Sequence, residues 1–144
     1  MADRSKYAWV NKSFNHFFNW LFRLRKGRVA FRGAPACILH TTGARTGQPR
    51  QTPLLCLPLD AGRYAVVGSN GGDDRDPAWV HNLRKQQAVE VEVRGQRVPM
   101  TAEVADAETR AALWPGLVKM YRQYDAYQRK TDREIPVIVL TPQR

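Results

Sequence analysis

One stretch of this sequence decides its fold: His40-Thr41-Thr42-Gly43-Ala44-Arg45-Thr46-Gly47-Gln48-Pro49-Arg50. It joins two apolar runs, 36–39 and 52–59, which predict two strands with a projecting loop between them. Gly43 and Gly47 allow positive φ and close backbone approach, so successive N–H groups of the loop can converge on an anion. Threonine hydroxyls and the guanidinium groups of Arg45 and Arg50 add donors suited to phosphate. An ordinary hairpin loop with surface arginines has the same composition, so the residues alone leave both interpretations open.

Strand patterns continue through most of the chain beyond this loop. Neither a Walker A sequence nor a G-x-G-x-x-G fingerprint is present, so the common nucleotide-binding folds are not indicated. Pro53 and Pro58 are expected at exposed or bulged ends of the second strand. The predicted strands are Ala36–Thr41, Gln51–Leu59, Arg63–Ser69, Val89–Arg94, Arg97–Val104 and Ile135–Leu140. About six mostly antiparallel strands with two short interposed helices suggest a small barrel.

The helices are predicted from capping residues. The first follows a polar loop over residues 69–77, with Asp76 as N-cap and Pro77 at the first helical position. Asp106 caps the second, and Pro115 is expected to interrupt or restart it. The segment Tyr121–Lys130 is also expected to be helical.

The N-terminal segment carries most of the positive charge. The net charge is +10, and residues 1–34 hold eight Lys or Arg against one acidic residue. Residues 6–26 follow an amphipathic helical pattern, with an aromatic apolar stripe opposite a cationic face. That pattern fits either a helix packed on the core or one lying on an anionic membrane surface. A linker, Gly27–Pro35, would then divide the chain into a segment 1–35 and a domain 36–144.

Cysteine and histidine placement gives little sign of metal chemistry. Cys37 and Cys56 lie in predicted strands and are expected to be small buried hydrophobes in a reducing compartment, although the sequence leaves a disulfide open. The three histidines have no ligands at metal-binding spacing, so no metal is expected. The chain has neither an apolar run of about 18 residues nor a signal peptide, which predicts a cytoplasmic protein.

Four landmarks in order resemble the deazaflavin (F₄₂₀)-dependent nitroreductases and F₄₂₀H₂-dependent quinone reductases. They are the loop quoted above; Gly68-Ser69-Asn70-Gly71-Gly72 with Asp76-Pro77-Ala78-Trp79-Val80-His81-Asn82-Leu83; Trp114-Pro115 with Tyr121, Tyr124 and Tyr127; and Thr131-Asp132-Arg133-Glu134-Ile135-Pro136 with the apolar run that follows. The resemblance spans residues 38–141. It implies an α+β, mainly β, split β-barrel like that of flavin-mononucleotide-binding oxidoreductases. It also implies reduced F₄₂₀ as the hydride donor.

The resemblance also implies where the cofactor would bind. Its anionic end would contact the quoted loop, and Ser69 with the following helix would line the ring and ribityl region. Asn70-Gly71-Gly72 stands where family members often carry Lys, so Arg75 is expected to compensate. The implied cofactor contacts are Arg45, Thr46, Gly47, Arg50, Pro53, Ser69, Asn70, Arg75, Ala78, Trp79 and Asn82. In most proteins a lone tryptophan such as Trp79 is a core residue, and that interpretation stays open.

The tyrosines supply the implied acceptor site. Tyr121, Tyr124 and Tyr127 would form one wall of the pocket for a quinone or nitroaromatic, and Ser69 or a tyrosine hydroxyl would polarise the acceptor. Leu55 replaces a tyrosine often found in nitroreducing members, which favours quinone reduction. Quinone-reducing members associate with the membrane, so the implied location is cytoplasmic or peripheral on the inner face of the cell membrane, through residues 1–26.

Two other functions are weighed against hydride transfer. A split-barrel protein can bind another flavin, haem or lipid without efficient turnover, and only experiment separates that alternative. A nucleic-acid binder could use the basic N-terminal segment, but no RNA- or DNA-binding module is recognisable, so no nucleic-acid partner is expected.

Overall fold

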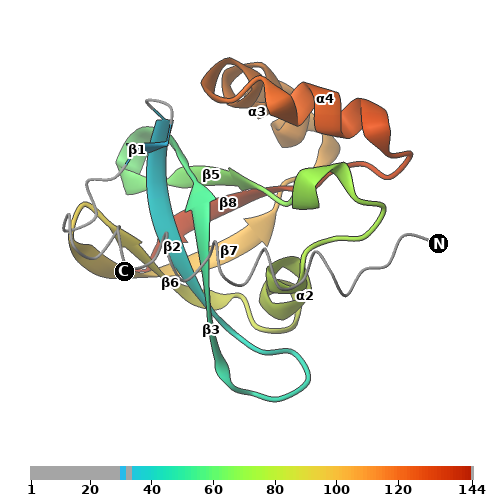
Figure 1. The fold of residues 1–144 in the computed structure, drawn as a ribbon. Helices are drawn as coiled ribbons and strands as arrows, with labels where there is room; N and C mark the ends of the chain where they lie inside the picture. The colour runs from blue at the N-terminus through green and yellow to red at the C-terminus, as the bar shows by residue number, and fades with distance from the viewer. Residues whose placement is uncertain (1–29, 32–33, 144) are drawn as a thin grey trace.

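A computed structural model describes residues 30–31 and 34–143, which form a curled antiparallel sheet with helices at one end and on one face (Figure 1). The predicted helix 6–26 lies outside these residues. The strands are β1 (Ala30–Phe31), β2 (Ala34–Thr42), β3 (Pro49–Leu55), β4 (Leu57–Pro58), β5 (Tyr64–Val67), β6 (Ala88–Val93), β7 (Gln96–Val104) and β8 (Val137–Pro142). The helices are α2 (Ala78–Lys85), α3 (Ala107–Met120) and α4 (Gln123–Lys130), with 3₁₀ turns η1 (Asp60–Gly62) and η2 (Asn70–Gly72). The mainly β fold predicted from the sequence is confirmed.

The sheet curls because one stretch of chain contributes to both of its ends. The strand order is β1-β2-β6-β7-β8-β5-β4, and β3 pairs with β2. The prediction of one strand over 51–59 is therefore wrong, since the stretch breaks at Cys56 into β3, on β2, and β4, on β5. Cys56 is fully buried, and its N–H donates to Pro35 O at 3.0 Å. Pro53 lies within β3 rather than at its end, whereas Pro58 is exposed at the end of β4.

The start of the sheet also differs from the expectation. Residues 30–31 and 34–35, predicted as linker, pair with one another as β1 and the first residues of β2. With the divided strand, this brings the described part of the chain to eight strands. Two of them, β1 and β4, are only two residues long. Three helices are found there, in the three segments that were expected to be helical.

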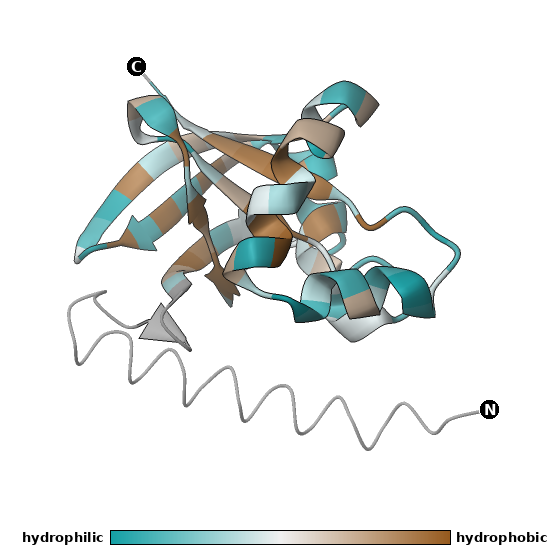
Figure 2. Ribbon diagram, turned by 90° about the horizontal axis from the view of Figure 1, so that it is seen from above, coloured by the Kyte–Doolittle hydropathy of each residue, from teal (hydrophilic) through white to brown (hydrophobic). Residues whose placement is uncertain are grey.

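Alternation along the strands builds two cores on opposite faces of the sheet. Val66 of β5 points into the barrel, whereas its neighbours Ala65 and Val67 point outward, as the period of two requires. The same alternation produces the brown and teal segments along the strands in Figure 2. Inside the barrel, α2 packs against the strands through Trp79, Val80 and Leu83.

The outward core lies beneath α3 and α4, which sit together on one side of the barrel (Figure 1). Asp106 caps α3 as predicted, because its carboxylate accepts a hydrogen bond from Thr109 N at 2.8 Å. Pro115 does not interrupt α3, which is continuous to Met120. Pro115 itself is exposed, and Leu113 and Leu117 on either side of it pack into the outward core.

Two helix boundaries were predicted incorrectly. The N-cap of α2 is Pro77, not Asp76, because the Asp76 carboxylate pairs with Arg84 and Arg133 instead. Helix α4 begins at Gln123, so Tyr121 lies outside it, at the C-cap of α3. The three tyrosines therefore do not share one helix.

The two cysteines are free thiols, fully buried as expected. The hydrogen bond with Cys56, followed by burial, holds the pKa of the Cys37 thiol well above its usual value. Because the thiolate is the reactive form, Cys37 acts as a small apolar group in β2, beside the buried Cys56 at the bend between β3 and β4.

Candidate functional site

The loop between β2 and β3 is a compact turn with an exposed cationic tip. Gly43 N donates to Gln48 O at 2.8 Å, and Gly47 N donates to Gly43 O at 2.9 Å. Gly47 has φ +71°, a conformation that strongly favours glycine. Arg45 and Arg50 are exposed, and Arg50 reaches only a weak contact of 3.5 Å with Thr46 Oγ1. Both arginines are therefore available to an anion in solution.

Helix α2 holds this loop against the barrel through the side chain of Asn82. Asn82 Oδ1 accepts from Ala44 N at 2.8 Å, and Asn82 Nδ2 donates to Thr41 Oγ1 at 3.2 Å. Asn82 and Thr41 are 7% and 6% exposed, so the bond between their side chains is shielded from water. Lys85 adds a bond of 2.6 Å from Nζ to Ala44 O. The polar atoms of the Asn82 side chain are thus committed to the loop, although this residue was predicted as a direct cofactor contact.

A second loop, residues 68–76, reaches the other end of α2. Ser69 and Asn70 lie at its start, and Asn70 Nδ2 donates to Arg75 O at 3.1 Å. Arg75 is exposed, and within the described residues its guanidinium makes no hydrogen bond or ion pair. The guanidinium of Arg45 is likewise exposed and makes no hydrogen bond or ion pair with the described residues. The two cations therefore come from loops fixed at opposite ends of a helix about 12 Å long, given eight residues at ~1.5 Å each.

The tyrosines form a cluster beside the second loop. Gly72 of η2 lies so close to α4 that a Cβ there would be 3.0 Å from Tyr127 O. The Tyr121 ring contacts Tyr124 edge-on at a centroid distance of 5.1 Å, and the Tyr121 and Tyr127 hydroxyls are 3.5 Å apart. Tyr121 and Tyr127 are half-buried. Tyr124 is only 6% exposed, and burial, with Tyr121 close by, raises its pKa far above the ordinary value, so its hydroxyl stays protonated.

Most of the predicted site residues gather around α2. The β2–β3 loop is bonded to α2 through Asn82 and Lys85, and the 68–76 loop leads into the first turn of α2, with Gly68 close to Val80. Ala78 is exposed at the start of α2, while the Trp79 side chain is 6% exposed and belongs to the barrel core. Pro53 is set apart from this group, half-buried within β3 and opposite Ile38.

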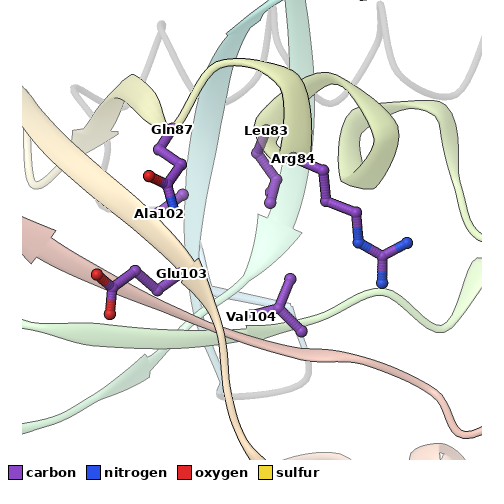
Figure 3. Close-up of a pocket in the computed structure, with 6 residues that line it drawn as sticks. All are labelled: Leu83, Arg84, Gln87, Ala102, Glu103 and Val104. Carbon is purple, nitrogen blue, oxygen red and sulfur yellow. The ribbon is translucent and has the colours of Figure 1, made fainter.

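Two cavities lie away from the predicted site residues. One, of about 410 Å³, opens between the end of α2 and β7 and is lined by Leu83, Arg84, Gln87, Ala102, Glu103 and Val104 (Figure 3). The other, of about 470 Å³, lies between η1, α3 and β8. Within the described residues there is no cluster of three or more His, Cys, Asp or Glu side chains suited to a metal ion. In the same part of the chain, no helix has the length and apolar character needed to cross a membrane.

The arrangement suits an anionic, elongated cofactor better than a small enclosed ligand. The exposed guanidinium groups of Arg45 and Arg75, on loops at the two ends of α2, can bind anionic groups. Comparison with known proteins decides which cofactor this is. Residues 17–142 match the family model described as F420H(2)-dependent quinone reductase. The chain belongs to this family.

Individual relatives agree with the family model. An F420H(2)-dependent quinone reductase of Mycobacterium tuberculosis is 41% identical over 127 residues, which cover 84% of this chain and 85% of the relative. Among solved structures, an F420-H2 dependent reductase called FDR-A matches with TM-score 0.68 and 37% identity, over 74% of this chain and 93% of that one. A Listeria innocua structure titled as a pyridoxamine 5′-phosphate oxidase matches with TM-score 0.53 and 12% identity, over 76% and 84% of the two chains. At that identity the likeness shows the fold alone.

Family membership makes this chain an oxidoreductase, with reduced F₄₂₀ as its hydride donor. The split-barrel fold and the cofactor implied by the sequence resemblance are therefore confirmed. The exposed loop arginines fit such a cofactor, because its phosphate and acidic tail need cationic partners.

The contacts of Arg133 with the 68–76 loop were not predicted from the sequence. Its guanidinium donates to backbone and side-chain acceptors throughout the loop of residues 68–76. Arg133 lies in the fourth landmark, but its partners are about 60 residues earlier in the chain. No local pattern in the sequence could have indicated those contacts.

Proposed function

We propose that this protein transfers a hydride from reduced F₄₂₀ to a quinone, with the cofactor lying along α2. The observation that carries the proposal is the pair of cationic loops fixed at the two ends of this helix. Arg45 and Arg50 would bind anionic groups of the cofactor at one end, and Arg75 would do so at the other. Thr46, Gly47 and Asn70 would supply further loop contacts, and the exposed first turn of α2 at Ala78 would face the ribityl region.

The acceptor would lie between the Ser69 turn and the tyrosine cluster. When bound, reduced F₄₂₀ supplies the hydride. Tyr121 and Tyr127 are half-buried and can each present a hydroxyl to the acceptor oxygen, where negative charge develops during reduction. Ser69 is half-buried and offers another donor. Tyr124 would support the two other rings from below, because it is packed in the core.

Quinones are favoured over nitroaromatics as acceptors. Leu55 ends β3 and is half-buried, so it can provide apolar contact but no hydroxyl to hold a nitro group. Nitroaromatic reduction is proposed only as a weaker side activity. A side-by-side comparison of turnover with a soluble quinone and a nitroaromatic would test this order.

Arg50→Ala tests the proposed cofactor site directly. Loss of a well-ordered bidentate contact costs about 1.5–3 kcal/mol, which predicts an F₄₂₀ dissociation constant roughly 10- to 150-fold higher. Arg97→Ala is the matched control, because Arg97 is an exposed arginine that pairs with Glu90 on the β6–β7 hairpin. Fluorescence titration with F₄₂₀, and in parallel with flavin mononucleotide, measures both variants. Equal F₄₂₀ affinities for Arg50→Ala and the parent at low and high salt would remove Arg50 from the site. Tighter binding of flavin mononucleotide than of F₄₂₀ would favour the alternative function.

We also propose that residues 1–26 attach the enzyme to anionic membrane, where lipophilic quinones are dissolved. The support is the sequence of this segment, with an aromatic stripe opposite a cationic face. Deletion of residues 1–26 should abolish co-sedimentation with vesicles containing phosphatidylglycerol while sparing reduction of a soluble quinone. Aggregation of the shortened chain, or loss of its activity in solution, would instead assign the segment to the folded core, and the attachment proposal would be wrong.

A further inference from the structure

We propose that Arg133 is a positioning residue that holds the loop of residues 68–76 in the shape required for cofactor and acceptor binding. This inference rests on the proposed function, because that loop carries Ser69, Asn70 and Arg75 of the proposed site. Arg133 itself would touch neither cofactor nor acceptor.

The contacts of Arg133 extend along the whole loop. Its Nε donates to Asp73 O at 2.8 Å, and one terminal nitrogen donates to Ser69 O at 2.9 Å. Both terminal nitrogens also lie 3.3 Å from Gly68 O, and Nη1 donates to Asp76 Oδ1 at 2.8 Å. One side chain therefore binds the first residues, the middle and the last residue of the loop.

The burial of this arginine explains why the contacts matter. The side chains of Arg133 and Asp76 are 16% and 15% exposed, so water competes weakly for their hydrogen bonds. Three of the acceptors are main-chain oxygens, which any residue at positions 68, 69 and 73 would offer. The planar guanidinium offers five donors in a fixed fork, which matches acceptors on several sides at once. A lysine ammonium has three donors on a flexible stem and cannot reach the same set.

Besides Arg133, the loop is held by Gly68 N, which donates to Pro136 O at 2.9 Å, and by Asp74, whose carboxylate accepts from Thr131 Oγ1 at 2.8 Å. Within η2, Gly72 N donates to Ser69 O at 2.8 Å, and Gly71 and Gly72 both have positive φ. Two consecutive glycines allow many alternative backbone conformations. Arg133 shares the Ser69 carbonyl with Gly72, so it fixes the orientation of the peptide that carries the proposed Ser69 donor.

Asp76 carries the restraint onward to α2. Its Oδ2 accepts from Arg84 at 3.0 Å while Oδ1 accepts from Arg133, and Pro77 follows as the N-cap of the helix. The beginning of α2, where Ala78 lies, is thereby held in register with the Ser69 turn. Loss of Arg133 should loosen both together.

The test compares Arg133→Gln and Arg133→Lys with Arg110→Gln. Arg110 is a suitable control because its side chain is also 16% exposed and donates to a backbone carbonyl, Ile135 O, at 2.9 Å, yet its partners Ile135, Gln128 and Glu134 all lie outside the 68–76 loop. Thermal unfolding, hydrogen–deuterium exchange of peptides covering 68–76, and F₄₂₀ fluorescence titration are measured on the full chain.

All three variants should unfold at lower temperature than the parent. Exchange in residues 68–76, measured without cofactor, should increase at least tenfold in both Arg133 variants but not in Arg110→Gln. The F₄₂₀ dissociation constant should rise about tenfold in the same two variants. Arg133→Lys should recover part of the thermal stability without recovering slow exchange, and this variant carries the test if Arg133→Gln fails to fold.

Two results would overturn the inference. One is parental exchange in residues 68–76 when Arg133 is replaced. The other is parental F₄₂₀ affinity in a variant whose loop exchanges rapidly. Absence of F₄₂₀ binding by the parent chain would count against the proposed function instead, and the exchange measurement would still decide whether Arg133 holds the loop.

Discussion

The amide of Asn82 offers a sharp test of how the β2–β3 loop is kept ready for an anion. Asn82→Ala removes the acceptor for Ala44 N–H and the donor to Thr41 Oγ1. The helix itself should persist, because alanine is the strongest helix former. The Lys85 bond to Ala44 O also remains, so the loop loses one of two attachments to α2.

The magnitude follows from the burial of the groups left unpaired. An unsatisfied buried donor or acceptor costs about 1–3 kcal/mol. The Thr41 hydroxyl is buried but can rotate toward another acceptor, whereas Ala44 N–H is only half-buried and water can partly replace its partner. We therefore expect a loss of ~2 kcal/mol in the free energy of unfolding, or roughly 6–8 °C in Tm for a chain of this size. Because binding must then order the loop, F₄₂₀ affinity should fall about tenfold.

Gln128→Ala is the matched control. Gln128 is also a side-chain amide that bridges backbone groups, since it accepts from Ile135 N at 2.9 Å and donates to Arg133 O at 2.8 Å. Urea unfolding should show comparable destabilisation of both variants. F₄₂₀ titration should show the larger loss of affinity in Asn82→Ala, because Gln128 is linked to the proposed site only through the backbone of Arg133. Parental F₄₂₀ affinity in Asn82→Ala would refute the reasoning. A hundredfold loss of affinity with no loss of stability would show that Asn82 contacts the cofactor directly.

Three further predictions concern other parts of the molecule. Tyr121→Phe and Tyr127→Phe should each lower kcat for a quinone by about tenfold, equivalent to ~1.4 kcal/mol, while Tyr124→Phe leaves kcat unchanged. If steady-state kinetics gives equal kcat values for all three variants and the parent, the tyrosines have only a structural role. Gly72→Ala should reduce the free energy of unfolding by about 2–4 kcal/mol, because residue 72 has a left-handed backbone conformation and its new Cβ would clash with the α4 backbone. Gly71→Ala should cost only ~1–2 kcal/mol, because Gly71 also has positive φ but open space around it. Similar urea midpoints for the two variants would contradict this. Asp106→Ala should lower Tm at pH 7, because the hydrogen bond from Thr109 N lowers the pKa of Asp106 in the folded state. The resulting contribution to stability is complete above the ordinary pKa of about 3.9 and is lost as the pH falls through the lowered folded-state pKa. A Tm difference from the parent that persists unchanged down to pH 2 would refute this prediction.

Local sequence predicted the strands and the Asp106 cap but failed where distant contacts override local preference. The run Leu54-Leu55-Cys56-Leu57 has no breaker at its centre, yet the chain bends at Cys56 because β2 and β5 each bind half of it. Asp76 precedes Pro77 as an N-cap residue would, but its carboxylate forms ion pairs with Arg133 and Arg84 instead. Pro115 remains inside α3 because apolar residues on both sides of it are packed against the barrel.

The candidate site was predicted to a similar depth. The glycines and arginines of the β2–β3 loop were recognisable because they are contiguous in the sequence. The roles of Asn82 and Arg133 were not, since each binds backbone groups about 40 to 65 residues away. Tyr124 was placed with its neighbours by the family resemblance, and only the packing of α4 shows that it is buried.

The register of β3 has a consequence for how the folded protein avoids aggregation. The bonds from Gly43 N to Gln48 O and from Cys56 N to Pro35 O fix which residues of β3 turn their N–H groups toward β2. Because the pattern alternates, the N–H positions of residues 49, 51, 53 and 55 face the opposite side, where the described sheet has no hydrogen-bonded partner strand. Two of those four positions are prolines, Pro49 and Pro53, which have no N–H to donate. An incoming strand from another molecule would therefore find a broken row of donors, so this edge is a poor template for intermolecular β-pairing.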